Sequence, residues 1–136
     1  MSLEIEVSNR GAELTSIKFN GKEMLHDGKK YWDRQSPVLF PTVGRLRDNK
    51  TIINDNKYEI PQHGFAKDME FKLIKETENE KLYITKSNEE TLKMYPFKFE
   101  LYTKYIINED TLTVEYKITN KDIDVASACF AYSRFY

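Results

Sequence analysis

One of the two histidines of the chain, His63, lies between a proline and a glycine in the stretch PQHGFAKDMEF, residues 61–71. An imidazole, with an ordinary pKa near 6.5, can donate or accept a proton at neutral pH. Pro61 and Gly64 predict a sharp turn, which can aim the ring into a cleft. Taken alone, the stretch favours the simpler interpretation, a surface turn histidine without a function.

A second candidate is Arg45, in the stretch FPTVGRLRDN, residues 40–49. A guanidinium group offers five donors in a fixed plane, which suits sugar hydroxyls, carboxylates or phosphates. Gly44 allows the backbone to bend closely beside it. The residues alone favour a solvated loop arginine, and Arg47 is expected to be more solvated than Arg45.

Asp68 and Glu70 follow His63 closely and could form a carboxylate pair for acid–base chemistry. The alternate positions are taken by Phe65, Met69 and Phe71, so we predict instead that both acids are charges at a strand entry, on the solvent face.

A metal or cofactor site is not expected. The chain has two histidines and one cysteine, Cys129, and their spacing matches no metal-ligand pattern. The sequence also has no glycine-rich phosphate loop and no nucleophile elbow.

Length and charge limit the class of protein. The 136 residues suffice for one domain, and the net charge of −1 gives no attraction for nucleic acid or anionic lipid. No segment approaches the roughly 20 apolar residues of a membrane helix. Glu4 and Glu6 interrupt any signal-peptide core, and a single cysteine forms no internal disulfide, so we expect a cytoplasmic protein without a membrane partner.

The elements that must position these side chains are strands. Apolar residues alternate with polar ones over residues 97–107 and again over 111–119, around a turn at 108–110, which predicts an antiparallel hairpin. Further hairpins are predicted around three short turns, at Asn20-Gly21, Asp55-Asn56 and Glu78-Asn79.

In total we expect four hairpins and about eight or nine strands. Helix is limited to a capping box at residues 87–90, followed by at most two turns before Pro96. Residues 26–50 form the one long irregular stretch, and long loops are often functional. These features predict an all-β protein of antiparallel sheets.

The two candidate stretches together resemble the aldose 1-epimerase (galactose mutarotase-like) family, most closely its bacterial LacX-type branch. SPVLFPTVGRLRDN, residues 36–49, is followed by PQHGFAKDMEF, residues 61–71, and MYPFKFELYTKYIINEDTLTVEYKITNKD resembles the central hairpin of that family. The resemblance implies an antiparallel β-sandwich, the mutarotase-like supersandwich, of which residues 1–136 would be the N-terminal part.

The resemblance also implies a reaction, the interconversion of the α and β anomers of a hexose such as galactose or glucose. A base takes the proton of the anomeric hydroxyl while an acid protonates the ring oxygen, and each contributes about 10²–10⁴-fold. Arg45 then corresponds to the sugar-binding arginine. His63 corresponds to the first active-site histidine, which binds the sugar near the ring oxygen and assists its protonation.

Three departures from the family pattern bear on activity. The glutamate base and a sugar-binding aspartate of the family belong to a C-terminal half that this chain does not match. Tyr132 stands where a motif like GAHPAF has the second histidine, and its phenol, with a pKa near 10, is a poor proton shuttle. Lys67 replaces the arginine of the usual HGFAR, which weakens any contact that needs a planar fork.

The expected function is therefore that of an aldose 1-epimerase-like protein whose catalysis is impaired, with His63 as catalytic residue and with Arg45, His63, Lys67 and Tyr132 in contact with the sugar. One alternative is a non-catalytic carbohydrate-binding module or truncated fragment. Another is a hexose-6-phosphate 1-epimerase with Arg45 and Lys67 flanking the phosphate. Because a divided sandwich would expose strand edges, we also expect self-association into a homo-oligomer.

Overall fold

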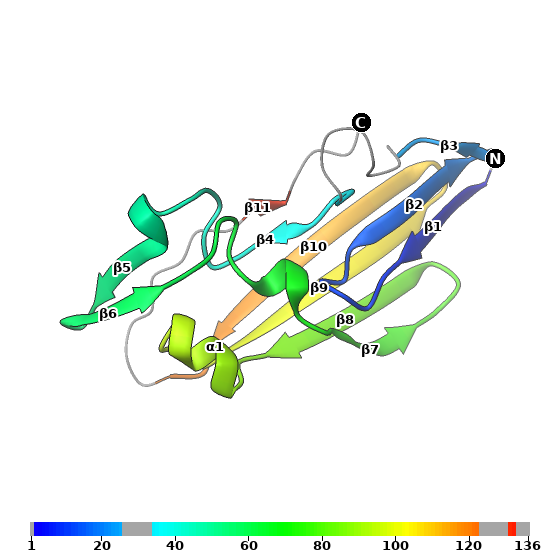
Figure 1. The fold of residues 1–136 in the computed structure, drawn as a ribbon. Helices are drawn as coiled ribbons and strands as arrows, with labels where there is room; N and C mark the ends of the chain where they lie inside the picture. Colours follow the sequence, from blue (N-terminus) through cyan, green and yellow to red (C-terminus); the bar gives the residue numbers. More distant parts are fainter. Residues whose placement is uncertain (1, 26–33, 123–130, 133–136) are drawn as a thin grey trace.

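Antiparallel strands make up most of the fold, as the sequence predicts (Figure 1). The computed structural model describes residues 2–25, 34–122 and 131–132. Each pair of neighbouring strands in its four sheets is antiparallel. The expectation of an all-β protein of antiparallel sheets is confirmed.

The largest sheet has four strands in the order β10-β9-β8-β7. Its strands are β7 (Lys72–Glu76), β8 (Glu80–Lys86), β9 (Phe99–Asn108) and β10 (Thr111–Asn120). The predicted hairpin of β9 and β10 is confirmed, with pairing from Asn108↔Thr111 to Phe99↔Asn120. Over residues 99–106 of β9, the side chains of one face are buried and those of the other are half-buried, as a strand with one face on the core requires.

A second sheet has three strands in the order β1-β2-β3. Its strands are β1 (Leu3–Val7), β2 (Leu14–Phe19) and β3 (Lys22–Glu23). The turn at Asn20-Gly21 is confirmed, since both residues have positive φ, 50° and 81°. Strand β1 was not predicted, although its alternation LEIEV is that of a half-buried strand.

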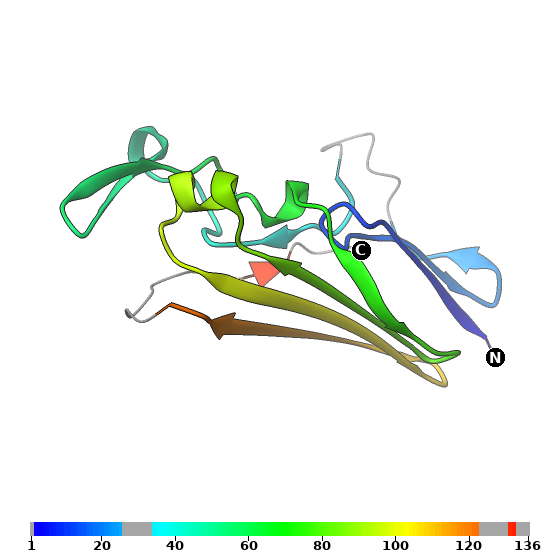
Figure 2. The same ribbon diagram turned by 90° about the horizontal axis from the view of Figure 1, so that it is seen from below.

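The two sheets lie in separate layers with the core between them. Strand β2 crosses in front of β9 and β10 in Figure 1 and lies above them in Figure 2. The buried cluster draws Leu14 and Ile17 from β2 and Leu101 and Tyr105 from β9. A hydrogen bond ties the layers together, since the Tyr105 hydroxyl donates to the Ala12 carbonyl at 2.6 Å.

Two short sheets and three short helices complete the described structure. The strands are β4 (Val38–Leu39), β5 (Lys50–Ile53), β6 (Asn56–Glu59) and β11 (Ala131–Tyr132), and the helices are η1 (Arg47–Asn49), η2 (Ala66–Asp68) and α1 (Glu89–Met94). Strand β4 pairs with β11, and the β5–β6 hairpin projects from the body of the molecule (Figure 1).

Two local predictions were wrong by one residue. The β5–β6 turn consists of Asn54 and Asp55, because Ile53 pairs with Asn56, so it does not fall at Asp55-Asn56. Both turn residues have positive φ, which asparagine and aspartate both tolerate. The cap of α1 is Asn88, whose box closes with Thr91; Ser87 and Glu90 do not form it.

No helix among the described residues is long and apolar enough to cross a membrane. His26 and Cys129 lie outside the described residues.

Candidate functional site

The two sequence stretches that carry Arg45 and His63 lie side by side in the structure. We call residues 40–46 the Arg45 loop and residues 61–65 the His63 turn. Phe40 and Gly64 form a parallel bridge. The carbonyl of Phe40 accepts from the N–H groups of Phe65 and Ala66 at 2.9 and 3.1 Å. The backbone N–H of His63 donates to the Gly44 carbonyl at 2.9 Å, next to Arg45.

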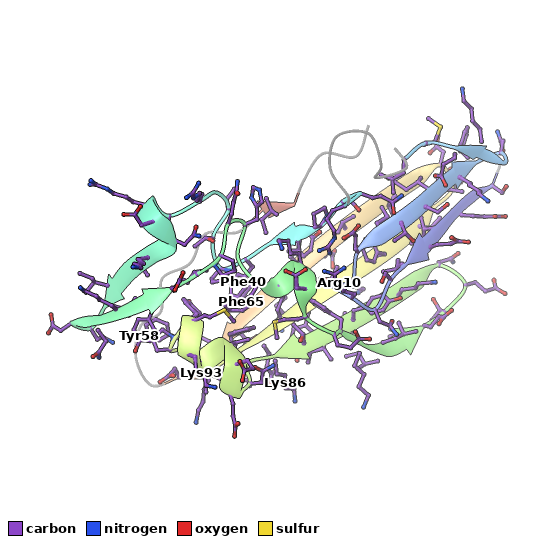
Figure 3. All side chains as sticks on the ribbon, in the orientation of Figure 1. Arg10, Phe40, Tyr58, Phe65, Lys86 and Lys93 are labelled. Carbon is purple, nitrogen blue, oxygen red and sulfur yellow. The ribbon has the colours of Figure 1, made fainter. Side chains whose placement is uncertain are left out.

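Phe40 anchors this pair of loops in the core. Its side chain is 1% exposed and packs edge-on against three rings, those of Phe65, Tyr95 and Phe99, with centroid distances of 6.3, 6.0 and 5.2 Å. Figure 3 shows Phe40 and Phe65 close together at the centre of the molecule. Aromatic rings in this arrangement add to the free energy gained by their burial. The loops are therefore held by packing as well as by the backbone.

Gly64 makes this close approach of the two loops feasible. Its φ is +76°, and a Cβ at this position would collide with backbone atoms of Phe40 and Pro41. The peptide bond between Phe40 and Pro41 is cis. Only glycine fits a backbone that is left-handed and also lies directly against the backbone of another loop.

His63 is held at both its backbone and its ring. Its φ of +67° lies in the left-handed region, within a turn closed by the Gly64 N–H donating to the Pro61 carbonyl at 2.9 Å. Its half-buried ring places Nδ1 2.6 Å from the Val43 carbonyl oxygen. A carbonyl only accepts hydrogen bonds, so Nδ1 carries the proton. In the neutral ring the lone pair is therefore on Nε2.

The guanidinium-bearing residues of the Arg45 loop and of η1 are both exposed. Arg45 lies directly after Gly44, on the loop bound to the His63 turn, whereas Arg47 begins η1 beside the projecting hairpin. Both are exposed, and the greater solvation expected for Arg47 stays a prediction.

Lys67 and Asp68 belong to an ion-pair network that the sequence did not reveal. The Lys67 ammonium donates to Asp68 at 2.6 Å, and the other carboxylate oxygen of Asp68 accepts from Arg10 at 2.6 Å and from Arg34 at 2.9 Å. Partial burial by itself would raise the pKa of Asp68, but the hydrogen bond from Lys67 and the neighbouring cations lower it below its ordinary value.

The prediction for Asp68 was therefore incomplete. Asp68 is exposed, as predicted, but it ends a 3-10 helix and accepts hydrogen bonds from three cations. Glu70 is exposed, as predicted, and forms an isolated antiparallel bridge with Arg10. Arg34 and its partner Glu13 were missed, because 21 residues separate them and neither belongs to a motif.

Tyr132 lies on β11, whose backbone pairs with β4 so that Tyr132 is opposite Val38. Strand β4 leads directly into Phe40 and the Arg45 loop. The structure therefore brings the backbone of Tyr132 to the strand that carries this loop.

Of two surface hollows of the described part, one lies away from these loops and the other reaches the His63 turn at Phe65. One, of about 440 Å³, follows the β5–β6 hairpin and is lined by residues such as Arg47, Ile52 and Tyr58. The other, of about 380 Å³, lies between η2 and α1. Neither is lined by Arg45 or His63. Among the described residues, no group of three or more histidine, cysteine or acidic side chains could hold a metal ion.

Comparisons with known proteins agree with the fold and with the resemblance. The sequence model of the family "Aldose 1-epimerase" matches residues 1–132. Two curated relatives, the plasmid and chromosomal LacX proteins of Lactococcus lactis subsp. lactis, are 33% identical over 129 residues, which is 90% of this chain and 43% of each relative.

Solved structures show the same similarity in three dimensions. A galactose mutarotase-like protein from Lactobacillus casei ATCC 334 superposes with a TM-score of 0.86 at 31% identity, over 90% of this chain and 42% of that one. A galactose mutarotase related enzyme from Lactobacillus acidophilus gives 0.85 at 34% identity, over 88% and 41%. A putative aldose 1-epimerase from Escherichia coli K12 shares the fold, with a TM-score of 0.73 at 20% identity over 89% and 44%.

The fold and the two loops thus define a galactose mutarotase-like β-sandwich protein. The chain belongs to the aldose 1-epimerase family. It spans less than half the length of the curated relatives that it matches.

Proposed function

We propose that this chain provides the part of an aldose 1-epimerase site that binds a hexose and acts at its ring oxygen, with His63 and Arg45 as the residues in contact with the sugar. The observation that carries the proposal is the pairing of the two loops. His63 binds the Arg45 loop through its backbone at Gly44 and through its ring at Val43. Arg45 and His63, which are 18 positions apart in the sequence, are thereby carried by two loops that are hydrogen-bonded to each other.

His63 has the chemistry that ring opening of a sugar requires. Because Nδ1 donates to the Val43 carbonyl, Nε2 is the ring nitrogen that we assign to proton exchange with the sugar. The imidazolium form donates from Nε2 to the ring oxygen as the C1–O bond breaks, and the neutral form accepts that proton back as the ring closes. We assign no residue of the chain as the base that removes the proton of the anomeric hydroxyl.

Arg45 is proposed to orient the sugar. Its exposed guanidinium can donate to two adjacent hydroxyl oxygens at once. A substrate held in this way keeps its ring oxygen in register with His63, and positioning of this kind contributes to catalysis by reducing the entropy lost at the transition state.

A free hexose suits the site better than a phosphorylated one. The side chain of Lys67 is 17% exposed, and its ammonium group is bound to the Asp68 carboxylate at 2.6 Å. A substrate phosphate that recruited Lys67 would have to displace this carboxylate. We therefore propose galactose or glucose rather than hexose 6-phosphate.

Polarimetry on freshly dissolved α-glucose and α-galactose tests the reaction, and NMR titration with the same sugars tests binding. The matched variants are His63→Ala, Arg45→Ala and, as the control, Arg47→Ala, an exposed arginine on η1. We expect His63→Ala and Arg45→Ala each to weaken sugar binding at least about tenfold, as the loss of a hydrogen bond to a charged group does. We expect Arg47→Ala to bind like the unchanged chain.

The outcomes separate the candidate functions. Binding that depends on His63, with anomer exchange above the buffer rate, supports the epimerase site. Such binding with exchange at the buffer rate selects a non-catalytic carbohydrate-binding module. Binding that is unchanged in His63→Ala rejects the site.

We also propose self-association of the chain through β10, which forms one edge of the four-stranded sheet in the order β10-β9-β8-β7. Edge strands pair readily with other chains. Light scattering is expected to show a dimer or larger species, and a monomer at high protein concentration contradicts this.

A further inference from the structure

We infer that Arg34 is a positioning residue for the candidate site, because it joins the chain that enters the Arg45 loop to the helix that leaves the His63 turn. This inference rests on the proposed function of those loops and adds a residue outside both motifs. Arg34 is 7% exposed, so its guanidinium is committed to the interior of the protein.

The guanidinium of Arg34 is satisfied on two sides. On one side it meets Glu13, with Nε donating to the carboxylate at 2.6 Å and a terminal nitrogen 2.5 Å from the same oxygen. On the other side it reaches η2, donating to the Asp68 carboxylate at 2.9 Å and to the Lys67 carbonyl at 2.5 Å. A planar fork can hold four such contacts at once, whereas the ammonium of a lysine cannot.

The first end of the link sets the path into the Arg45 loop. The second carboxylate oxygen of Glu13 accepts from the Gln35 N–H at 2.9 Å, and the Ser36 hydroxyl donates to the Leu14 carbonyl at 2.7 Å. Residues 34–36 are thus hydrogen-bonded to the start of β2 and to the residue before it. They continue directly into β4 and Phe40, whose carbonyl binds the His63 turn.

The second end of the link holds the exit from the His63 turn. Helix η2 begins at Ala66, whose N–H donates to the Phe40 carbonyl together with that of Phe65. The Lys67 carbonyl lies against Gly11, where a Cβ would collide with it, so η2 is confined between Gly11 and Arg34. Removing Arg34 takes away the contacts that hold η2 on one side, at Lys67 and Asp68, four and five residues after His63.

Loss of Arg34 should therefore loosen the position of the Arg45 loop relative to the His63 turn. Amide hydrogen exchange measures this loosening. The test variant is the double substitution Glu13→Gln with Arg34→Met, which removes both buried charges, keeps similar volumes and keeps an oxygen for the Gln35 N–H. Replacing both members of a buried pair is far better tolerated than leaving one charge alone. The matched control is Glu80→Gln with Lys104→Met, a 3.1 Å ion pair between β8 and β9.

We expect the Phe65 and Ala66 amides of the double variant to exchange at least about tenfold faster relative to the Leu101 amide of β9, since local opening is then easier than global unfolding. The ¹⁵N shifts of the His63 ring should move towards a mixture of tautomers, because the bond to Val43 is no longer held in register. The control should change neither. Galactose and glucose affinity should fall about tenfold in the double variant only.

A folded double variant with site amides and His63 shifts like those of the unchanged chain overturns the inference, and leaves Arg34 as a residue of stability alone. If the double variant does not fold, Arg34→Lys decides by the same two readouts, since it keeps the charge and loses the fork. An unchanged chain that binds no sugar rejects the proposed function, whereas the exchange rates and ring shifts still test the role of Arg34.

Discussion

The Nδ1 atom of His63 lies 2.6 Å from the carbonyl oxygen of Val43, on the loop that carries Arg45. The contact joins two residues 20 positions apart and settles which ring nitrogen carries the proton in the neutral form, because a carbonyl oxygen only accepts. It also holds the ring against rotation about the Cα–Cβ bond. The orientation of the imidazole is therefore a property of the paired loops and not of the His63 turn alone.

We expect ¹⁵N NMR of the neutral protein to show His63 as the Nδ1–H tautomer, with Nε2 unprotonated. A histidine in an unstructured peptide, which lacks the carbonyl partner, serves as the reference. The physical reason is that the bond to Val43 is lost if the proton moves to Nε2. A neutral His63 with the proton on Nε2 contradicts the geometry and with it the assigned role of that nitrogen.

Gly64→Ala is expected to destabilise the protein by about 2–5 kcal/mol, because the left-handed backbone costs roughly 1–2 kcal/mol and overpacking adds about 1–3 kcal/mol. The added Cβ would meet backbone atoms of Phe40 and Pro41, which cannot rotate away. Urea unfolding measures the change.

Gly21→Ala is the matched control for this substitution. Its φ of +81° is similar, but nothing lies within 4 Å of the added Cβ. We expect it to cost only the backbone strain, roughly 1–2 kcal/mol. Equal losses for Gly21→Ala and Gly64→Ala would show that the loops do not press on each other.

The strands and the site differ in how far the sequence predicts them. Strands β9 and β10 follow from strict alternation and a polar turn, since the period of two decides which face meets the core. The β5–β6 turn was misplaced because Asn54, Asp55 and Asn56 all tolerate positive φ, and the pairing of flanking residues decides among them.

Long-range contacts leave no mark on the local pattern. The bonds between the Arg45 loop and the His63 turn join residues about 20 positions apart, and only the resemblance to a family suggested that these loops act together. Arg34 and Glu13 carried no such hint. A buried arginine is recognised only from the partners that surround it in the fold.

Asp68 should make the protein sensitive to acid. Its pKa is lowered from 3.8, so the folded protein favours the charged carboxylate more than the unfolded chain does. The resulting stability is present above the unfolded pKa and is lost as the pH falls below about 4 towards the folded value. Asp68→Asn is therefore expected to flatten the acid side of the stability profile, measured as urea midpoints between about pH 6 and 3.

Glu4→Gln controls for the loss of one negative charge, since Glu4 is an exposed carboxylate on β1. We expect its acid profile to follow that of the unchanged chain. If the urea midpoints of Asp68→Asn fall with acid as steeply as those of the unchanged chain, the three cations around Asp68 do not act on its carboxylate in solution.

Tyr105→Phe tests the link between the two layers. The Tyr105 hydroxyl donates to the Ala12 carbonyl at 2.6 Å, and the two residues are 2% and 1% exposed. Without the hydroxyl, the Ala12 carbonyl loses this donor in the interior, and we expect a cost of about 1–3 kcal/mol. Tyr102→Phe is the control, since Tyr102 is only half-buried and its hydroxyl donates to the Glu100 side chain at 2.8 Å; we expect a loss of less than about 0.5 kcal/mol.

An alkaline profile adds a second readout for the same substitution. Burial raises the pKa of Tyr105 well above 10.0, so the folded protein favours the neutral phenol. The unfolded chain releases the proton first, and stability is therefore lost as the pH rises above about 10. Tyr105→Phe should remove this part of the alkaline loss while Tyr102→Phe keeps it. A Tyr105→Phe protein that unfolds like the unchanged chain at both neutral and alkaline pH would show that the layers are held together without this hydrogen bond.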